Sequence, residues 1–136
     1  MLVAASKVQE QKNQYEDVRP IPKLNIEELT ELDCVRPMND FTSLLFHCEP
    51  VKRYSGACLK CGKSHNYYSN GKSDRLVHDI SMGLVHIDII VKSPRYECNE
   101  CGETFTYPFQ SLIQGKQFTK RLYEQIYKCE NHHTKF

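Results

Sequence analysis

The sequence has no tryptophan, no long apolar run and almost no net charge. A membrane-spanning helix needs roughly 18 or more consecutive apolar residues, and no segment approaches that length. The first six residues are too short and too lightly charged to form a secretory signal. These absences argue against a membrane protein or an exported protein, so we expect a cytoplasmic location.

What remains is typical of a small globular chain. The 136 residues are 40% hydrophobic and 26% charged, which fits one compact domain with a tail. The seven cysteines are an odd number in a chain without an export signal. Such a set favours metal binding or free thiols over a disulfide framework.

Charge is unevenly distributed along the chain. Residues 1–50 hold five lysines and arginines against nine aspartates and glutamates, whereas residues 51–128 hold twelve against seven. The second part is therefore the one expected to meet a polyanion.

The amino-terminal part is predicted to be an arm followed by a short helix. Residues 1–23 are polar and lack periodicity, which indicates a flexible arm. Asn25 and Glu28 have the spacing of a capping box, and the apolar stripe that follows predicts a helix over Ile26 to Cys34. Residues 41–48 are compatible with a strand.

The middle of the chain predicts a β-hairpin. Residues 75–80 and 84–91 flank the turn at 81–83, and the second segment alternates apolar and polar residues. Pro94 cannot donate to a ladder, so we expect a bend or an edge there. Residues 103–109 indicate another short strand, and Thr119 can cap a final helix.

These elements predict an α+β fold: a small antiparallel β domain with short flanking helices. The expected organisation is a flexible arm at 1–23, a β domain with its amino-terminal helix at 24–117, and a basic helix at 118–136.

Two short motifs carry the chemistry. Cys58 and Cys61 are separated by two residues and followed by glycine, and the same pattern recurs at Cys98 and Cys101. Two such knuckles supply the four sulfurs of a structural Zn²⁺ site, and the hairpin between them can bring them together. The β domain at 24–117 is therefore expected to be zinc-binding and zinc-ribbon-like. Iron or redox chemistry is the weaker alternative, since no βαβ pattern surrounds either pair. A closed sulfur shell leaves no position for substrate, so we expect no enzymatic activity.

The other thiols, imidazoles and carboxylates are expected to be structural. Cys34 and Cys48 lie among apolar neighbours and are interpreted as small core residues. The carboxylates Asp74, Asp79 and Asp88 are interpreted as surface or turn residues. Cys129, His132 and His133 have helical spacing and are the candidate ligands of a second metal site near the carboxyl end. The favoured interpretation of this segment is the polar end of a helix.

Basic and aromatic residues surround the knuckles in sequence. Basic side chains suit phosphate contacts, and Tyr54, Tyr67 and Tyr68 can pack on sugars or bases or, alternatively, belong to a core. The candidate nucleic-acid-binding residues are Lys52, Arg53, Lys60, Lys63, Lys72, Arg75, Lys92, Arg95, Lys120 and Arg121.

From about residue 41 to 128, the chain resembles the amino-terminal zinc-binding region of the ISL-three type insertion-sequence transposases. The likeness depends on the two CxxCG knuckles, the segment LVHIDIIVKSPRYEC and the following CGETFT. The resemblance implies a region that helps to recognise transposon ends. Helix-turn-helix and catalytic segments follow this region in the family, and the chain ends before they would begin.

The sequence therefore predicts a transposase-like, mobile-element DNA-binding module with one structural zinc and no catalytic domain. The alternative is a protein-interaction module, or a mobile-element-encoded inhibitor, that binds a protein through its acidic arm or aromatic surface. Neither hypothesis involves a membrane.

Overall fold

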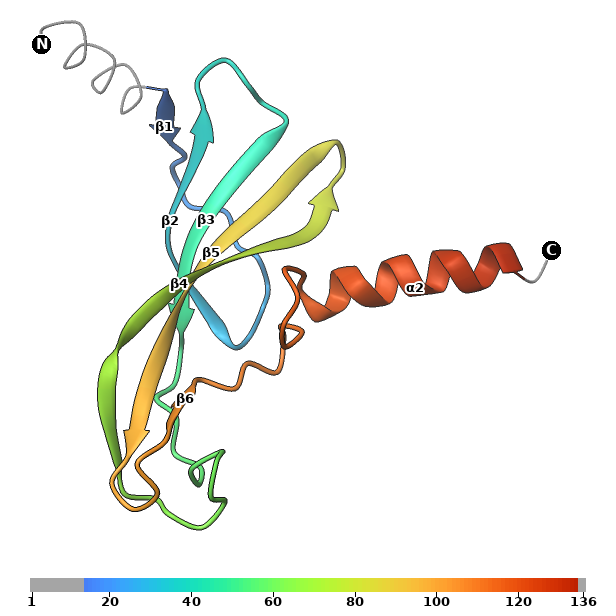
Figure 1. Ribbon diagram of the computed structural model, residues 1–136. Coiled ribbons are helices and arrows are strands. Elements are labelled where there is room, and N and C mark those ends of the chain that lie inside the picture. Colours follow the sequence, from blue (N-terminus) through green and yellow to red (C-terminus); the bar gives the residue numbers. More distant parts are fainter. Residues whose placement is uncertain (1–13, 135–136) are drawn as a thin grey trace, which may run out of the picture.

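The chain folds around one six-stranded sheet. The computed structural model describes residues 14–134, with side chains through residue 128. In the sheet the strands follow the order β1-β2-β3-β5-β4, and β6 pairs with β5 (Figure 1). The strands are β1 (Tyr15–Asp17), β2 (Leu29–Pro37), β3 (Ser43–Pro50), β4 (Tyr67–Met82), β5 (Val85–Cys98) and β6 (Thr104–Thr106).

The predicted β domain is confirmed in its main character, with two differences. The pairing of β3 with β5 is parallel, whereas the other pairings are antiparallel. A parallel pair needs a long crossover, and the first knuckle together with β4 provides it. Within the described residues there is one α-helix, α2 (Lys120–Thr134), so the fold is a β-sheet with a terminal helix.

The helix predicted over Ile26 to Cys34 is wrong, because most of this segment forms β2. Leu32 is an extra residue in the β2–β3 ladder, since the register shifts between Glu31 and Asp33. This bulge lets Leu29 and Cys34 both be buried although they are five positions apart. Ile26, Leu29 and Leu32 have the spacing of a helical stripe in the sequence, but Leu32 is the bulge residue and is 39% exposed.

The predicted capping box is absent for a related reason. Asn25 has a φ of 60°, whereas an N-cap residue adopts the β region. The Glu28 carboxylate accepts hydrogen bonds from the backbone amides of Gln110 (2.8 Å) and Ser111 (3.0 Å). Glu28 therefore ties the carboxyl-terminal segment to the start of β2.

The predicted hairpin is confirmed and is longer than expected. Strands β4 and β5 pair from Tyr67 with Cys98 at one end to Met82 with Val85 at the tip. Pro94 lies inside β5, opposite a bulge. Between the pairs Ser69–Tyr96 and Lys72–Pro94, two β4 residues face one β5 residue, and one of the two is Gly71 at a φ of 82°.

The two faces of β5 are covered by different cores. Side chains alternate along a strand, so Ile87, Ile89 and Val91 lie on one face, and Tyr96 and Cys98 lie on the other. The sheet core comprises Leu24, Ile26, Leu29, Cys34, Phe46, Cys48, Val77, Ile87, Ile89, Val91 and Leu112. The knuckle core comprises Cys58, Tyr96, Cys98 and Phe105, with Tyr54, Cys61 and Tyr67 packed against them.

Helix α2 begins where expected and projects away from the sheet (Figure 1). The hydroxyl of Thr119 accepts a hydrogen bond from the amide of Leu122 (3.3 Å), as an N-cap does. The same hydroxyl donates to the Asp79 carboxylate (2.8 Å), which also pairs with Arg121. Asp79 is 6% exposed, so its interpretation as a surface residue is wrong.

Part of the predicted flexible arm lies outside the described residues, at 1–13. Within the remainder, Tyr15–Asp17 pairs with β2 as β1, and Arg36 of β2 binds Glu16 at 2.6 Å. No helix in the described part of the chain combines the length and apolar character needed to cross a bilayer.

Candidate metal centre

The two knuckles adopt matching turns. In the first, the amide of Gly62 donates to the carbonyl of Cys58 (2.8 Å); in the second, the amide of Gly102 donates to the carbonyl of Cys98 (3.0 Å). The two glycines have φ values of 71° and 73°. Residues other than glycine rarely adopt this left-handed backbone region, which is why glycine closes each turn.

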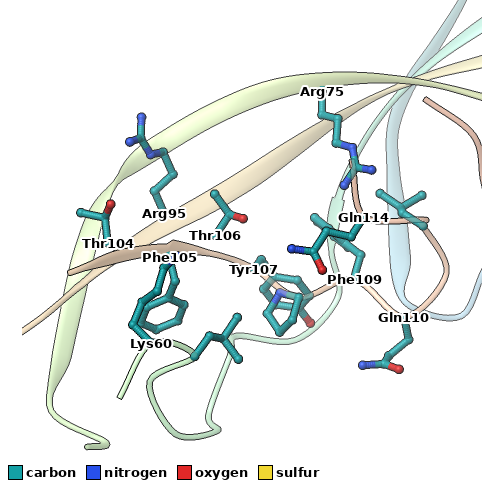
Figure 2. A pocket seen from close by; sticks show the side chains of 13 residues that line it. Lys60, Arg75, Arg95, Thr104, Phe105, Thr106, Tyr107, Phe109, Gln110 and Gln114 are labelled. Carbon is teal, nitrogen blue, oxygen red and sulfur yellow. The ribbon is translucent and has the colours of Figure 1, made fainter. Parts of the chain in front are cut away.

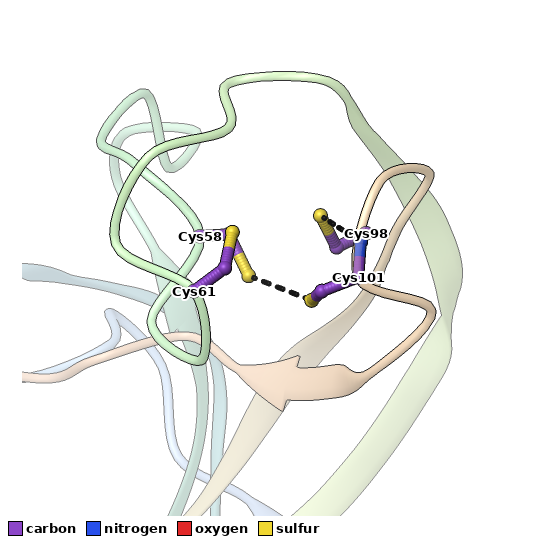
Figure 3. Close-up of side chains that lie close together, drawn as sticks. All are labelled: Cys58, Cys61, Cys98 and Cys101. Atoms are coloured by element: carbon purple, nitrogen blue, oxygen red, sulfur yellow. Dashed lines mark hydrogen bonds between the residues drawn. The ribbon is translucent and has the colours of Figure 1, made fainter.

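The four cysteine sulfurs converge between these turns. The two pairs face each other from separate loops (Figure 3), and all four ligand atoms lie within 4.8 Å of one another. Tetrahedral zinc with Zn–S bonds of about 2.3 Å places sulfurs about 3.8 Å apart. The sulfurs of Cys58 and Cys101 are 3.7 Å apart, so the site has the size that zinc requires.

Backbone amides point at two of the sulfurs. The amide of Lys60 donates to the sulfur of Cys58 (3.4 Å), and the amide of Cys101 donates to the sulfur of Cys98 (3.5 Å). Such donors spread thiolate charge and orient the ligands. They are the consequence of the tight turns, so the same local sequence supplies the ligand and its support.

The thiols differ in how readily they ionise. The amide of Cys101, followed by that of Glu100, helps to lower the pKa of Cys98 to about 6. The Glu103 amide favours the thiolate of Cys101, but desolvation and the nearby sulfurs of Cys98 and Cys58 raise the pKa of Cys101 to about 12. Four thiolates cannot share this space without a cation, and a divalent metal supplies it.

Residues of the knuckle core hold the loop that leads to Cys58 and Cys61. The hydroxyl of Tyr67 donates to the carbonyls of Gly56 (2.9 Å) and Tyr54 (3.1 Å). Ring centroids of Tyr67 and Tyr96 lie 5.3 Å apart, and those of Tyr96 and Phe105 lie 5.4 Å apart. Tyr54 and Tyr67 are therefore structural, which was one of the two interpretations left open, whereas Tyr68 is 45% exposed.

Two asparagines join the knuckles, and no sequence pattern predicts this role for them. The amide of Asn99 donates to the carbonyl of Asn66 (2.9 Å), and the two side chains share a second hydrogen bond of 2.9 Å. Their positions relative to the cysteines follow no repeated spacing. Only the folded hairpin brings them together.

Nine of the ten predicted nucleic-acid-binding residues line three hollows. Lys52, Arg53, Lys72 and Lys92 line a cleft of about 430 Å³. Lys60, Arg75 and Arg95 line a cavity of about 680 Å³ beside β6 (Figure 2). Lys120 and Arg121 line a third hollow of about 460 Å³ at the start of α2. Lys63 is exposed and lines none of these three.

Two of these cations are engaged within the fold. The guanidinium of Arg75 donates to the carbonyls of Ile113 and Lys116, the latter at 2.7 Å. Arg121 donates to the carbonyl of Leu24 (2.9 Å) as well as to Asp79. Both arginines hold the carboxyl-terminal segment against the sheet, which limits what they can offer to a partner.

Two of the remaining cysteines are core residues, as the sequence suggested. Cys34 and Cys48 are buried in the sheet core, where desolvation raises the pKa of Cys34 to about 11 and that of Cys48 to about 12. The suggested second site at Cys129, His132 and His133 lies outside the described side chains.

Comparison with known families agrees with this geometry. Residues 55–101 match the family described as the zinc-finger of transposase IS204/IS1001/IS1096/IS1165, and all four cysteines lie in the match. The predicted resemblance is thereby confirmed over about a third of the chain. No curated protein and no solved structure matches the chain.

Within residues 55–101 the site matches that of a transposase-type zinc ribbon. Cys58, Cys61, Cys98 and Cys101 are positioned as the ligands of one structural Zn²⁺. Because four sulfurs complete a tetrahedral shell, the metal has no open position for a water or a substrate.

Proposed function

We propose that this protein is a zinc-stabilised DNA-binding module of the kind that recognises transposon ends. The observation that carries the proposal is the match of residues 55–101 to a transposase zinc finger whose four ligands converge in space. The metal's role is to build a scaffold, so the function resides in what the scaffold displays. Here that surface is basic.

The distribution of charge supports DNA as the partner. Lys52, Arg53, Lys63 and Lys72 are exposed and lie in or near the matched segment. Lysine and arginine side chains at a protein surface neutralise phosphates and release condensed counterions, which drives association with a duplex.

Fluorescence anisotropy of a labelled duplex tests the proposal. The zinc-loaded chain is titrated at about 50 mM and about 200 mM salt, where a protein that contacts several phosphates loses affinity steeply. We expect salt-sensitive binding at micromolar protein or below, and the Cys98→Ser variant to lose it. Absence of salt-sensitive binding by the zinc-loaded protein would reject the function.

One observation favours the alternative of a protein partner. Helix α2 exposes Tyr123, Ile126 and Tyr127 along its length. The acidic arm invoked for that alternative lies partly outside the described residues. A double variant, Ile126→Ser with Tyr127→Ser, separates the two functions: a DNA-binding module keeps its affinity for the duplex, whereas a protein-binding module loses its partner in a pull-down.

A further inference from the structure

The cleft lined by Lys52, Arg53, Lys72 and Lys92 lies on the face of β5 that carries the knuckle core. Lys92 and Pro94 project from the same face of β5 as Tyr96, because side chains two positions apart share a face. Lys72 is paired with Pro94 across the hairpin, next to the bulge at Gly71. The segment between β3 and the first knuckle completes the cleft with Lys52 and Arg53.

The four cations of this cleft are not consumed by the fold. Across residues 14–128, none of them has a carboxylate oxygen within 4.0 Å, whereas Arg36 and Arg121 do. Glu49 is the one acidic residue among those that line the cleft, so the lining has an excess of positive charge. In the cavity beside β6, by contrast, Arg75 already binds two backbone carbonyls.

The wall of the cleft suits a sugar-phosphate chain. Pro50, Pro94 and Tyr96 provide apolar surface between the cations, and Ser69 is the one uncharged polar side chain among the lining residues. No asparagine or glutamine, the side chains that read adenine edges, lines it. Lysines act as point charges that suit phosphate oxygens, and contacts to phosphate carry no sequence information directly.

The zinc site fixes half of this cleft. Arg53 immediately precedes Tyr54, whose ring lies 5.7 Å from both Tyr67 and Phe105 in the knuckle core. Lys92 follows Val91 of the sheet core directly in β5. The separation of the cations across the cleft therefore depends on both cores, and on the metal that holds one of them.

We propose that this cleft is the surface that holds the phosphate backbone of duplex DNA, and that the cavity beside β6 is not. The inference rests on the proposed DNA-binding function and adds which face of the hairpin meets the duplex. It also assigns the cleft a sequence-independent contact, so base recognition belongs elsewhere on the protein.

A pair of charge-matched double variants tests the assignment. Lys72→Ala with Lys92→Ala removes two cations from the cleft, and Lys60→Ala with Arg95→Ala removes two from the other hollow. We expect the cleft variant to lose about tenfold or more in affinity and to reduce the slope of log K against log salt by about 2. The other variant should stay within about twofold of the parent protein.

The outcomes separate this inference from the function it rests on. Equal losses in both double variants, or a larger loss in the Lys60 and Arg95 variant, would overturn the assignment while leaving DNA binding in place. Failure of the parent protein to bind any duplex would overturn both. Two duplexes of unrelated sequence should suffer the same fold-loss, and a loss confined to one would contradict a backbone contact.

Folding of the variants is checked independently. Both double variants should retain one zinc per chain and the parent circular dichroism spectrum, since none of the four residues is buried. A single Lys92→Arg variant keeps the charge and should retain most of the parent's affinity for DNA, whereas Lys92→Ala should lose it. A role of Lys92 in folding alone predicts that affinity does not depend on the charge at this position.

Discussion

The two cores on opposite faces of β5 are stabilised by different chemistry. The sheet core buries eleven residues, most of them aliphatic, contributed by β2 to β5 and the segments that cross them. The knuckle core has four buried residues, of which two are cysteines that ligate metal. Apolar burial suffices for the first, whereas the second is too small to be stable without a cross-link.

This difference explains where the exposed and the internal cations lie. Two arginines hold the carboxyl-terminal segment against the sheet core. Arg121 pairs with Asp79, and Arg75 donates to backbone carbonyls of the segment at 113–116. The knuckle core is held together by a metal, so the lysines and arginines around it remain exposed. A zinc cross-link in a small core therefore leaves surface charge available to bind a ligand.

Removing zinc should have the largest effect. Binding of structural zinc to small domains contributes about 10–16 kcal/mol, far more than the two hydrogen bonds between Asn66 and Asn99 that also join the knuckles. With a chelator, we expect amides in residues 54–67 and 96–106 to lose protection in hydrogen-exchange mass spectrometry, whereas amides in 44–48 and 87–91 keep theirs. Simultaneous loss of both sets would show that the cores are not separable.

Truncation of the sheet core should produce the converse pattern. Phe46 is fully buried, and Phe→Ala in a core costs about 3–5 kcal/mol. Phe46→Ala should lower the free energy of unfolding by that amount while zinc affinity, measured by chelator competition, stays close to that of the parent. Phe105→Ala is the matched control in the knuckle core, and zinc affinity should fall there.

The ion pair of Asp79 with Arg121 should make the stability of the sheet core sensitive to acid. Burial alone would raise the pKa of Asp79, but hydrogen bonds from Arg121 and Thr119 lower it below its ordinary value. A carboxyl group with a lowered pKa in the folded state stabilises above its unfolded pKa, and this contribution is lost as the pH falls through the folded value.

Asp79→Asn should therefore destabilise the protein by about 3 kcal/mol at neutral pH, because it leaves Arg121 without its partner. The difference from the parent in chemical denaturation should shrink as the pH falls below about 4. A difference that stays constant down to pH 2 would argue against this linkage.

The smallest predicted effects come from two glycines, one near each core. Gly62 closes the first knuckle at a φ of 71°, and Gly83 forms the hairpin tip at 64°; an added Cβ at either meets nothing within 4 Å. The cost of alanine is therefore the left-handed backbone alone, about 1–2 kcal/mol. Gly62→Ala should weaken zinc binding, and Gly83→Ala should lower thermal stability with zinc affinity unchanged.

The features that sequence predicted best are those set by local spacing. Two CxxCG motifs specify two turns and four ligands, because the covalent chain keeps each pair together. The alternation at Ile87, Ile89 and Val91 likewise predicted a strand with one buried face. The cap at Thr119 is local in the same sense.

The features that sequence missed depend on contacts distant in the chain. The bulge at Leu32 conceals the period of β2, and only pairing with β3 reveals that the segment is extended. Asp79 looks like a turn residue until Arg121, 42 positions later, reaches it. The separation of Lys72 and Lys92 from Arg75 and Arg95 follows from the two faces of the long hairpin, which no linear pattern specifies.

Native mass spectrometry of cysteine variants tests the central claim most directly. The parent protein should carry one zinc per chain, and Cys58→Ser and Cys98→Ser should each lose it. Cys34→Ser is the matched control, because Cys34 is buried in the sheet core and ligates nothing, so this variant should keep its zinc. Zinc retained at full stoichiometry in Cys58→Ser and Cys98→Ser would contradict the account.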